Sequence, residues 1–198
     1  MNKIKNFALV IMTLFMMNDS YSQTNSNSKV SQNKTTQNIA RVKAYGDLFF
    51  GMPSDSVENI LQAQTYSLTI GNYEYIVYCY YHAADLLYKI SFTQVMPLSA
   101  GFYDTYLKVM HNDLLLTLKN KFGSPTTIYG YPDFLKMDNG YTKLSNVWRQ
   151  KDKTIELGIG ENDFSYFVCL FIYHNKMNSD VIKGIDKQQN QNRQNSGF

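Results

Sequence analysis

The chain has 198 residues, of which 18% are charged, and its formal net charge at pH 7 is +3. Binding to nucleic acids depends mainly on clustered lysines and arginines that neutralise phosphates, so this near-neutral chain without a basic stripe argues against a nucleic-acid partner. Aromatic residues make up 15% of the chain, with 16 Tyr, 12 Phe and 1 Trp. Because tyrosine buries a ring while its hydroxyl stays in water, this composition suits half-buried sheet faces and binding surfaces alike.

An export signal is predicted over residues 1–22. A positively charged start is followed by an apolar run from Phe7 to Met17, and the small residues Ser20 and Ser22 precede Gln23 as in a cleavage site. The apolar run is about 11 residues long, whereas a membrane-spanning helix needs roughly 20. A buried N-terminal helix is the alternative, but it would normally show a polar face. We expect a periplasmic or secreted protein and, because no cysteine follows the cleavage site, no membrane anchor after cleavage.

Two polar segments flank the part of the chain that has regular hydrophobic patterns. Residues 23–41 and 176–198 are rich in Gln and Asn and carry little apolar surface. Burial therefore cannot offset the entropy of ordering them. We expect a disordered linker over 23–41, a single α+β domain over 42–175 and a polar disordered tail over 176–198.

The first half of this domain is predicted as a helix followed by three strands. Leu48–Met52 is a short apolar strand, and the Pro53–Glu58 segment after it begins a helix, with Asp55 and Glu58 at the spacing of a capping box. Residues 86–94 alternate apolar and polar side chains, which is typical of a strand with one face in water. The three predicted strands cover residues 66–70, 73–81 and 86–94.

The second half begins with a longer helix over residues 101–122. Its apolar side chains recur every three or four residues, and Gly123 and Pro125 end it. Short turns favour antiparallel hairpins among the later strands. The predicted fold class is α+β: an antiparallel sheet with two helices packed on one face, in two helix-then-three-strand halves. The later strands are expected near residues 126–131 and over 143–150, 154–159 and 164–173.

Several short motifs in the chain resemble known exported proteins. Leu48–Glu58 resembles the opening of small exported α/β domains such as the β-lactamase-inhibitor-like proteins and the small lipoproteins of outer-membrane assembly. The later motifs together resemble uncharacterised exported proteins of Bacteroides-like bacteria. That resemblance implies a tandem TATA-binding-protein-like or β-lactamase-inhibitor-like sheet-and-helix fold and no activity, and DNA binding does not follow from the name of a fold. The later motifs are Leu118–Pro125, Val147–Arg149, Thr154–Leu157 and Cys169–Tyr173.

The sequence carries no motif of a catalytic centre or a metal site. His82, His111 and His174 are not at ligand spacing, and each is interpreted as a solvated or core-edge histidine. The segment from Asp133 to Gly140 offers oxygen ligands for calcium, but it lacks the spacing of an EF-hand. We predict no catalytic residue, no metal and no cofactor.

The best candidate for a contact surface is the aromatic loop around Pro132. Tyr129, Tyr131 and Phe134 stand beside glycine and proline, and apolar rings on such loops often form contact patches. The alternative is that Phe134 and Leu135 only cover the edge of the sheet.

Cys79 and Cys169 each fall in the middle of a predicted strand. In an oxidising compartment they could form one disulfide, which requires Cα atoms within roughly 7 Å and converging side chains. Two free thiols are the favoured interpretation, and the disulfide is the alternative.

These observations favour an exported binding or interaction module, non-catalytic, in the periplasm or at the cell surface. An envelope protein or a small ligand is the expected partner. A small envelope hydrolase or a hydrolase inhibitor is the alternative. A deep polar pocket with a histidine beside a serine or a carboxylate would favour that alternative.

Overall fold

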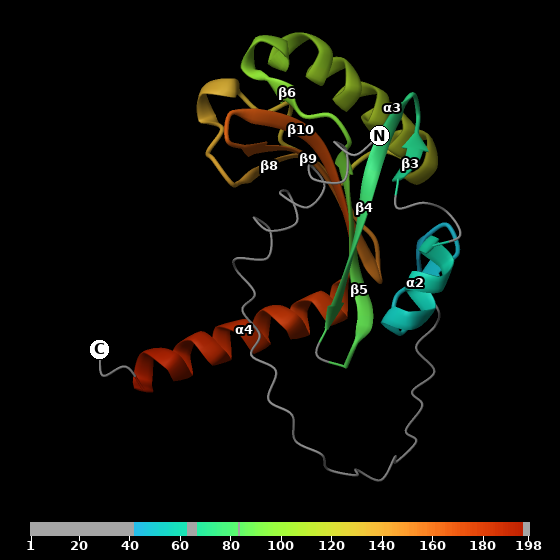
Figure 1. The fold of residues 1–198 in the computed structure, drawn as a ribbon, viewed down its shortest axis with the longest axis vertical. Coiled ribbons are helices and arrows are strands. Elements are labelled where there is room, and N and C mark those ends of the chain that lie inside the picture. Colours follow the sequence, from blue (N-terminus) through green and yellow to red (C-terminus); the bar gives the residue numbers. More distant parts are fainter. Residues whose placement is uncertain (1–41, 63–66, 83, 196–198) are drawn as a thin grey trace, which may run out of the picture. The chain divides into compact units, whose positions relative to one another are not determined.

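A computed structural model describes residues 42–62, 67–82 and 84–195. The fold is α+β and is dominated by an antiparallel sheet (Figure 1). The predicted signal peptide over 1–22 and linker over 23–41 lie outside the described residues. The strands are β1 (Lys43–Tyr45), β2 (Leu48–Phe49), β3 (Ser67–Ile70), β4 (Tyr73–His82), β5 (Leu86–Gln94), β6 (Leu98–Ser99), β7 (Thr127–Ile128), β8 (Thr142–Arg149), β9 (Lys153–Asn162) and β10 (Ser165–His174). The helices are α2 (Ser54–Gln62), α3 (Lys108–Phe122) and α4 (Asn175–Asn195).

The main sheet has the strand order β3-β4-β5-β10-β9-β8-β7, and β6 pairs with β10 at its side. Two long hairpins, β4–β5 and β9–β10, meet at its centre, where Leu170 pairs with Phe92 on one side and Leu157 on the other. The predicted strands over 66–70, 73–81 and 86–94 are confirmed as β3, β4 and β5. For β5 the signal was the alternation of apolar and polar residues, whereas β3 and β4 were predicted from the turn residues that separate the strands.

One face of the sheet, which we call the helix face, carries most of the core. Leu157, Leu170 and Ile172 point to this face and belong to the same buried cluster as Leu114 and Leu118 of α3. A short 3-10 turn and a π-helical turn, Tyr103–Leu107, lead into α3. The helix ends at Gly123 as predicted: this glycine has φ +78°, and its carbonyl accepts a 2.8 Å hydrogen bond from the indole N–H of Trp148.

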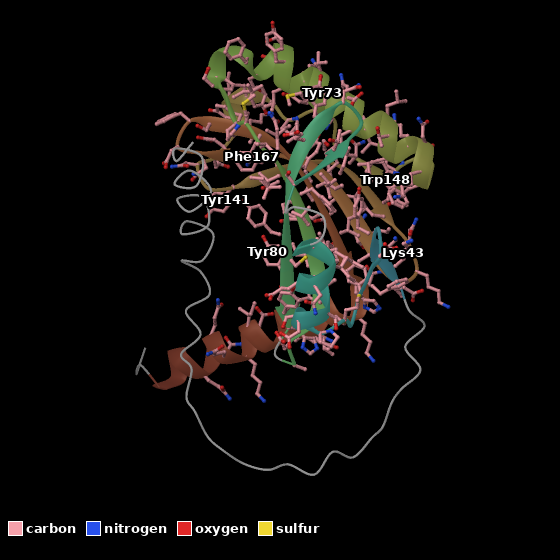
Figure 2. The ribbon with its side chains drawn as sticks, turned by 45° about the vertical axis from the view of Figure 1, so that its right-hand side comes forward. Lys43, Tyr73, Tyr80, Tyr141, Trp148 and Phe167 are labelled. Carbon is pink, nitrogen blue, oxygen red and sulfur yellow. The ribbon has the colours of Figure 1, made fainter. Side chains whose placement is uncertain are left out.

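The opposite face, which we call the outer face, carries the alternate side chains of the same strands. Cys169 pairs with Thr93 on this face, whereas Cys79 pairs with Ile90 on the helix face. Both cysteines are free thiols. Figure 2 shows Tyr80 and Phe167 on one side of the strands and Lys43 and Trp148 on the other.

The N-terminal hairpin β1–β2 is a separate two-stranded sheet. After it, the amide of Gly51 donates to the carbonyl of Leu87 (2.8 Å), and the amide of Leu87 donates to the carbonyl of Met52 (2.9 Å). At the start of α2, the Ser54 hydroxyl donates a hydrogen bond to the carboxylate of Asp85. These bonds attach the segment between β2 and α2 to the start of β5.

The C-terminal segment differs from its prediction. Where a disordered tail was expected over 176–198, the chain forms α4, which begins directly after β10 and contacts β5 and β10 (Figure 1). The Asn175 side chain anchors its start by accepting from the Thr154 hydroxyl (2.7 Å) and donating to the carbonyl of Gln150 (2.9 Å). The prediction considered only buried surface, but Gln, Lys and Arg are good helix formers. None of the helices in the described part of the chain is long and apolar enough to cross a membrane.

Candidate functional site

The predicted contact residues of the aromatic loop lie in two different environments, some packed against the core and some exposed. The hydroxyl of Tyr131 donates to the carbonyl of Tyr103 (2.7 Å), and its ring lies 5.3 Å from that of Tyr103. Phe134 also packs against Tyr103, with ring centroids 5.3 Å apart. Tyr129 is 62% exposed, and Leu135 is 86% exposed. Two of the three predicted contact residues therefore pack at the edge of the core, and Tyr129 is left as a surface residue.

One histidine does lie beside a serine, but both are buried. The Nε2 atom of His111 is 2.7 Å from the hydroxyl of Ser145, and that hydroxyl donates to the carbonyl of Leu157 (3.0 Å). Since the serine proton is already committed to a carbonyl, His111 is the donor in the pair, which is the reverse of what a general base needs. His111 is 1% exposed and Ser145 is fully buried. The pair joins α3 to β8 and is not accessible to a substrate.

The carboxylates of the long loop pair with lysines. Asp133 forms an ion pair with Lys136 (3.9 Å), and Asp138 forms one with Lys143 (2.6 Å). Within residues 42–62, 67–82 and 84–195, no group of three or more His, Cys, Asp or Glu side chains could hold a metal ion. The calcium interpretation of Asp133–Gly140 therefore gains no support from the geometry.

A cavity of about 280 Å³ lies on the helix face and was not predicted. Its walls are the β1–β2 hairpin, the end of β3 with the β3–β4 turn, the C-terminal half of α3, the start of β9 and the C-terminal half of β10. Its distinguishing feature is three lysines from three separate elements, so we call it the three-lysine pocket. The lining residues are Lys43, Ala44, Tyr45, Gly46, Thr69, Ile70, Gly71, Thr117, Leu118, Lys121, Phe122, Lys153, Leu170 and Ile172.

Aromatic rings and a backbone carbonyl position the lysines. The ammonium of Lys153 donates to the carbonyl of Lys43 (2.9 Å) and lies 5.4 Å from the ring centroid of Phe122. The ammonium of Lys121 lies 5.4 Å from the Tyr45 ring and 5.6 Å from the Phe122 ring. Contacts between a cation and a ring face are attractive, so Lys121 and Lys153 are both held near Phe122.

The electrostatics of the pocket are one-sided. No lining residue is acidic, and among the described residues none of the three lysines forms an ion pair. Burial lowers the pKa of the Lys153 ammonium from its usual 10.5, and the positive charges of Lys121 and Lys43 lower it further. Burial raises the pKa of the Tyr45 phenol, so this group stays neutral and adds no negative charge. The lysine end of the pocket is thus positively charged, and no carboxylate is among the residues that line the pocket.

Sequence reasoning missed this site for a physical reason. Lys43, Lys121 and Lys153 belong to β1, α3 and β9, and their spacing in the sequence does not indicate that they lie close together in the fold. A lysine in the last turn of a helix, such as Lys121 in α3, is already explained by its favourable interaction with the helix dipole, so it does not by itself indicate a binding site. Only the pairing of β9 with β10, and the packing of α3 and β1 nearby, bring the three together.

A second polar cluster lies on the outer face. The ammonium of Lys89 lies 4.9 Å from the Tyr80 ring and 4.7 Å from the Phe171 ring. Burial lowers the pKa of Lys89, and the nearby carboxylate of Glu156 opposes that shift. Glu156 in turn accepts a 2.9 Å hydrogen bond from the Tyr173 hydroxyl. The carboxylate of Glu156 partly compensates the charge of Lys89, so an anionic ligand would be attracted less strongly to this cluster than to the three-lysine pocket.

Comparison with protein-family models, with curated proteins and with solved structures found no match for this chain. The resemblance to exported proteins of Bacteroides-like bacteria therefore stays a prediction. The three-lysine pocket is the site on which a functional proposal can be based.

Proposed function

We propose that this protein is an exported, non-catalytic binding module of the periplasm or cell surface, and that it binds a small organic anion in the three-lysine pocket. One observation carries the proposal: three lysines converge on an apolar cavity without a carboxylate among the lining residues. The predicted export signal supports the cellular location.

Like charges in one site raise its free energy, because each ammonium disfavours the charged form of the others. Burial is the main cause of the lowered pKa of Lys153, and repulsion by Lys121 and Lys43 lowers it further. An anion in the pocket would interact favourably with all three ammonium groups at once. Titratable groups perturbed by burial and by specific charges inside a concave, mainly apolar site are a recognised mark of a binding site.

In the part of the chain that the structure describes, no arrangement of side chains favours the hydrolase alternative. The His111–Ser145 pair is buried, and neither residue lines the three-lysine pocket. The three lysines can hold an anion, but the lining residues supply neither a histidine nor a carboxylate as a general base.

We further propose that the domain consists of two halves, α2 with β3–β5 and α3 with β7–β10, and that both helices lie on one face of the sheet; the second half then has four strands where three were predicted. The shared core supports this arrangement, since Val57 and Leu61 of α2 belong to the same buried cluster as Leu114 and Leu118 of α3. In this arrangement the pocket lies where the C-terminal half of α3 meets the N-terminal hairpin.

The proposed function is tested by comparing an anion with its neutral counterpart of the same length. The full chain is titrated with hexanoate and with hexanamide at pH 7 and low ionic strength, by calorimetry and by thermal unfolding. A ligand that binds only the folded state raises the unfolding temperature, and the stabilisation grows with the logarithm of the ligand concentration once that exceeds the dissociation constant. We expect hexanoate to bind and to stabilise the protein, and hexanamide to do so much less. Equal effects of the two compounds, or no binding of hexanoate, would contradict the proposal.

A further inference from the structure

We infer that the ligand of the three-lysine pocket is an amphipathic anion, with its acidic head among the lysines and an apolar chain along the floor of the cavity. This inference rests on the proposed function and narrows it from small organic anions in general to those with an extended hydrocarbon part.

The floor of the cavity is apolar. Leu118, Leu170 and Ile172 line it, and they are 4%, 1% and 2% exposed. These side chains belong to the main core cluster and are almost fully covered, so the open apolar surface of the cavity comes mainly from the half-buried Ile70 and Phe122 of its lining. An inorganic anion would contact the lysines and leave this area without a partner, whereas a hydrocarbon chain would cover it.

The two ends of the cavity differ in charge, which gives the ligand a direction. Lys121, Lys153 and Lys43 lie at the end formed by the last turn of α3 and the β1 strand. At the other end, Thr117 lies about one helical turn before Lys121, beside Gly71. Asp113, one turn earlier again, accepts hydrogen bonds from the backbone amide (3.0 Å) and the side-chain amide (2.9 Å) of Asn72.

The carboxylate of Asp113 thus stands close to the Gly71 end, and it would repel an acidic head placed there. The head therefore lies among the lysines, and the chain extends toward Thr117 and Thr69. The rings of Tyr45 and Phe122 already contact the ammonium groups, so the ligand does not have to supply an aromatic ring to stack on them. The chemical class is a monocarboxylic acid, or a comparable acid, on an extended hydrocarbon chain.

The test is a homologous series of straight-chain carboxylates, from acetate through butanoate, hexanoate and octanoate to decanoate. Calorimetric titration of the full chain at pH 7, below the micelle concentration of each acid, gives one dissociation constant for each compound. Each methylene buried on the floor should tighten binding roughly fourfold, until the cavity is filled and the gain stops. Inorganic phosphate and decanamide are titrated in parallel.

The outcomes separate this inference from the proposed function. If phosphate and acetate bind as tightly as decanoate, the inference is overturned while anion binding stands. If no carboxylate binds, or if decanamide binds as tightly as decanoate, both are overturned. The variant Lys121→Gln supplies a second check. It should weaken every carboxylate by the same factor and leave the gain per methylene unchanged, and a change in that gain would overturn the placement of the head at Lys121.

Discussion

The ammonium group of Lys153 donates a 2.9 Å hydrogen bond to the backbone carbonyl of Lys43, 110 positions earlier in the chain. This bond joins the separate β1–β2 hairpin to the main sheet. It also holds the Lys153 ammonium beside the backbone of Lys43. The Lys153 ammonium, which would attract an anion, therefore also helps to hold the β1 wall of the pocket in place.

Replacing Lys153 should reduce stability as well as binding. Lys153→Gln removes the hydrogen bond to Lys43 but also removes a charge that burial and the neighbouring lysines disfavour. We therefore expect the free energy of unfolding to fall by no more than about 1 kcal/mol. Denaturant titration measures the change. Lys151→Gln, at an exposed turn position, is the matched control and should have little effect. If both variants unfold at the same denaturant concentration as the natural protein, the bond to Lys43 contributes nothing.

As the pH is raised, anion binding should begin to weaken at a lower pH than the usual pKa of a lysine would predict. Burial and the two neighbouring ammonium groups lower the pKa of Lys153 from 10.5. Lys153 therefore loses its proton, and with it the attraction for the anion, at a lower pH. In Lys121→Gln one of the lowering charges is removed, so the decline in octanoate affinity should move to higher pH. A titration of affinity against pH whose midpoint is the same in both proteins would contradict the coupling of these lysines.

The buried His111 should make the fold sensitive to mild acid. Burial lowers the pKa of His111 in the folded protein below its usual 6.5, so below about pH 6.5 the unfolded chain binds more protons than the folded one. Stability should be unaffected by this group at higher pH and should fall as the pH drops below that value. His111→Gln can still donate to Ser145 but cannot be protonated, and its unfolding free energy should depend less on pH between 7 and 5. An identical slope in both proteins would show that His111 is not the cause, since the pKa of His174 is lowered in the same way.

The turn between β9 and β10 should be strained. Phe164 has φ +60° and is 80% exposed, and Asp163 before it has φ +47°. A bulky residue in the left-handed region costs about 1–2 kcal/mol, and an exposed ring recovers little of this by packing. Because glycine also gains entropy in the unfolded chain, we expect Phe164→Gly to raise the unfolding free energy by a smaller amount, about 0.5–1 kcal/mol. Thermal unfolding measures it.

Tyr129→Gly is the matched control for Phe164→Gly. Tyr129 is also an exposed aromatic residue, but it does not have a positive φ. Its replacement should leave stability unchanged or lower it. A stabilisation of similar size in both variants would mean that loss of an exposed ring, and not backbone strain, is responsible.

The strands of the main sheet could be predicted because their signals are local. In β5 the alternation of buried Ile90 and Phe92 with Lys89 and Thr93 shows a strand with two different faces, and the turns on either side set its length. The end of α3 was equally predictable from Gly123. The helix α4 was missed because the prediction weighed burial and ignored intrinsic helix preference and the anchor that Asn175 provides.

The candidate site could not be predicted, because its charges come from elements that are distant in the chain. In the sequence, Lys43, Lys121 and Lys153 look like ordinary surface lysines, and nothing distinguishes Lys121 from Lys119 in the same helical turn. Aromatic content, by contrast, pointed to the loop around Tyr131, where the rings pack against Tyr103 instead of forming an open surface. A tertiary structure is needed to tell a lysine that lines a cavity from one that faces only solvent.

The most direct test of the three-lysine pocket is the affinity for octanoate of single lysine-to-glutamine variants that differ only in position. Lys43→Gln, Lys121→Gln and Lys153→Gln change residues that line the cavity, and Lys119→Gln and Lys151→Gln remove the same charge outside it. Calorimetry at pH 7 should show roughly fivefold weaker binding for each of the three pocket variants, which corresponds to about 1 kcal/mol per lost charge contact. The two control variants should bind almost as tightly as the natural protein. If all five variants weaken binding to the same extent, the effect is one of net charge, and the three-lysine pocket is not the binding site.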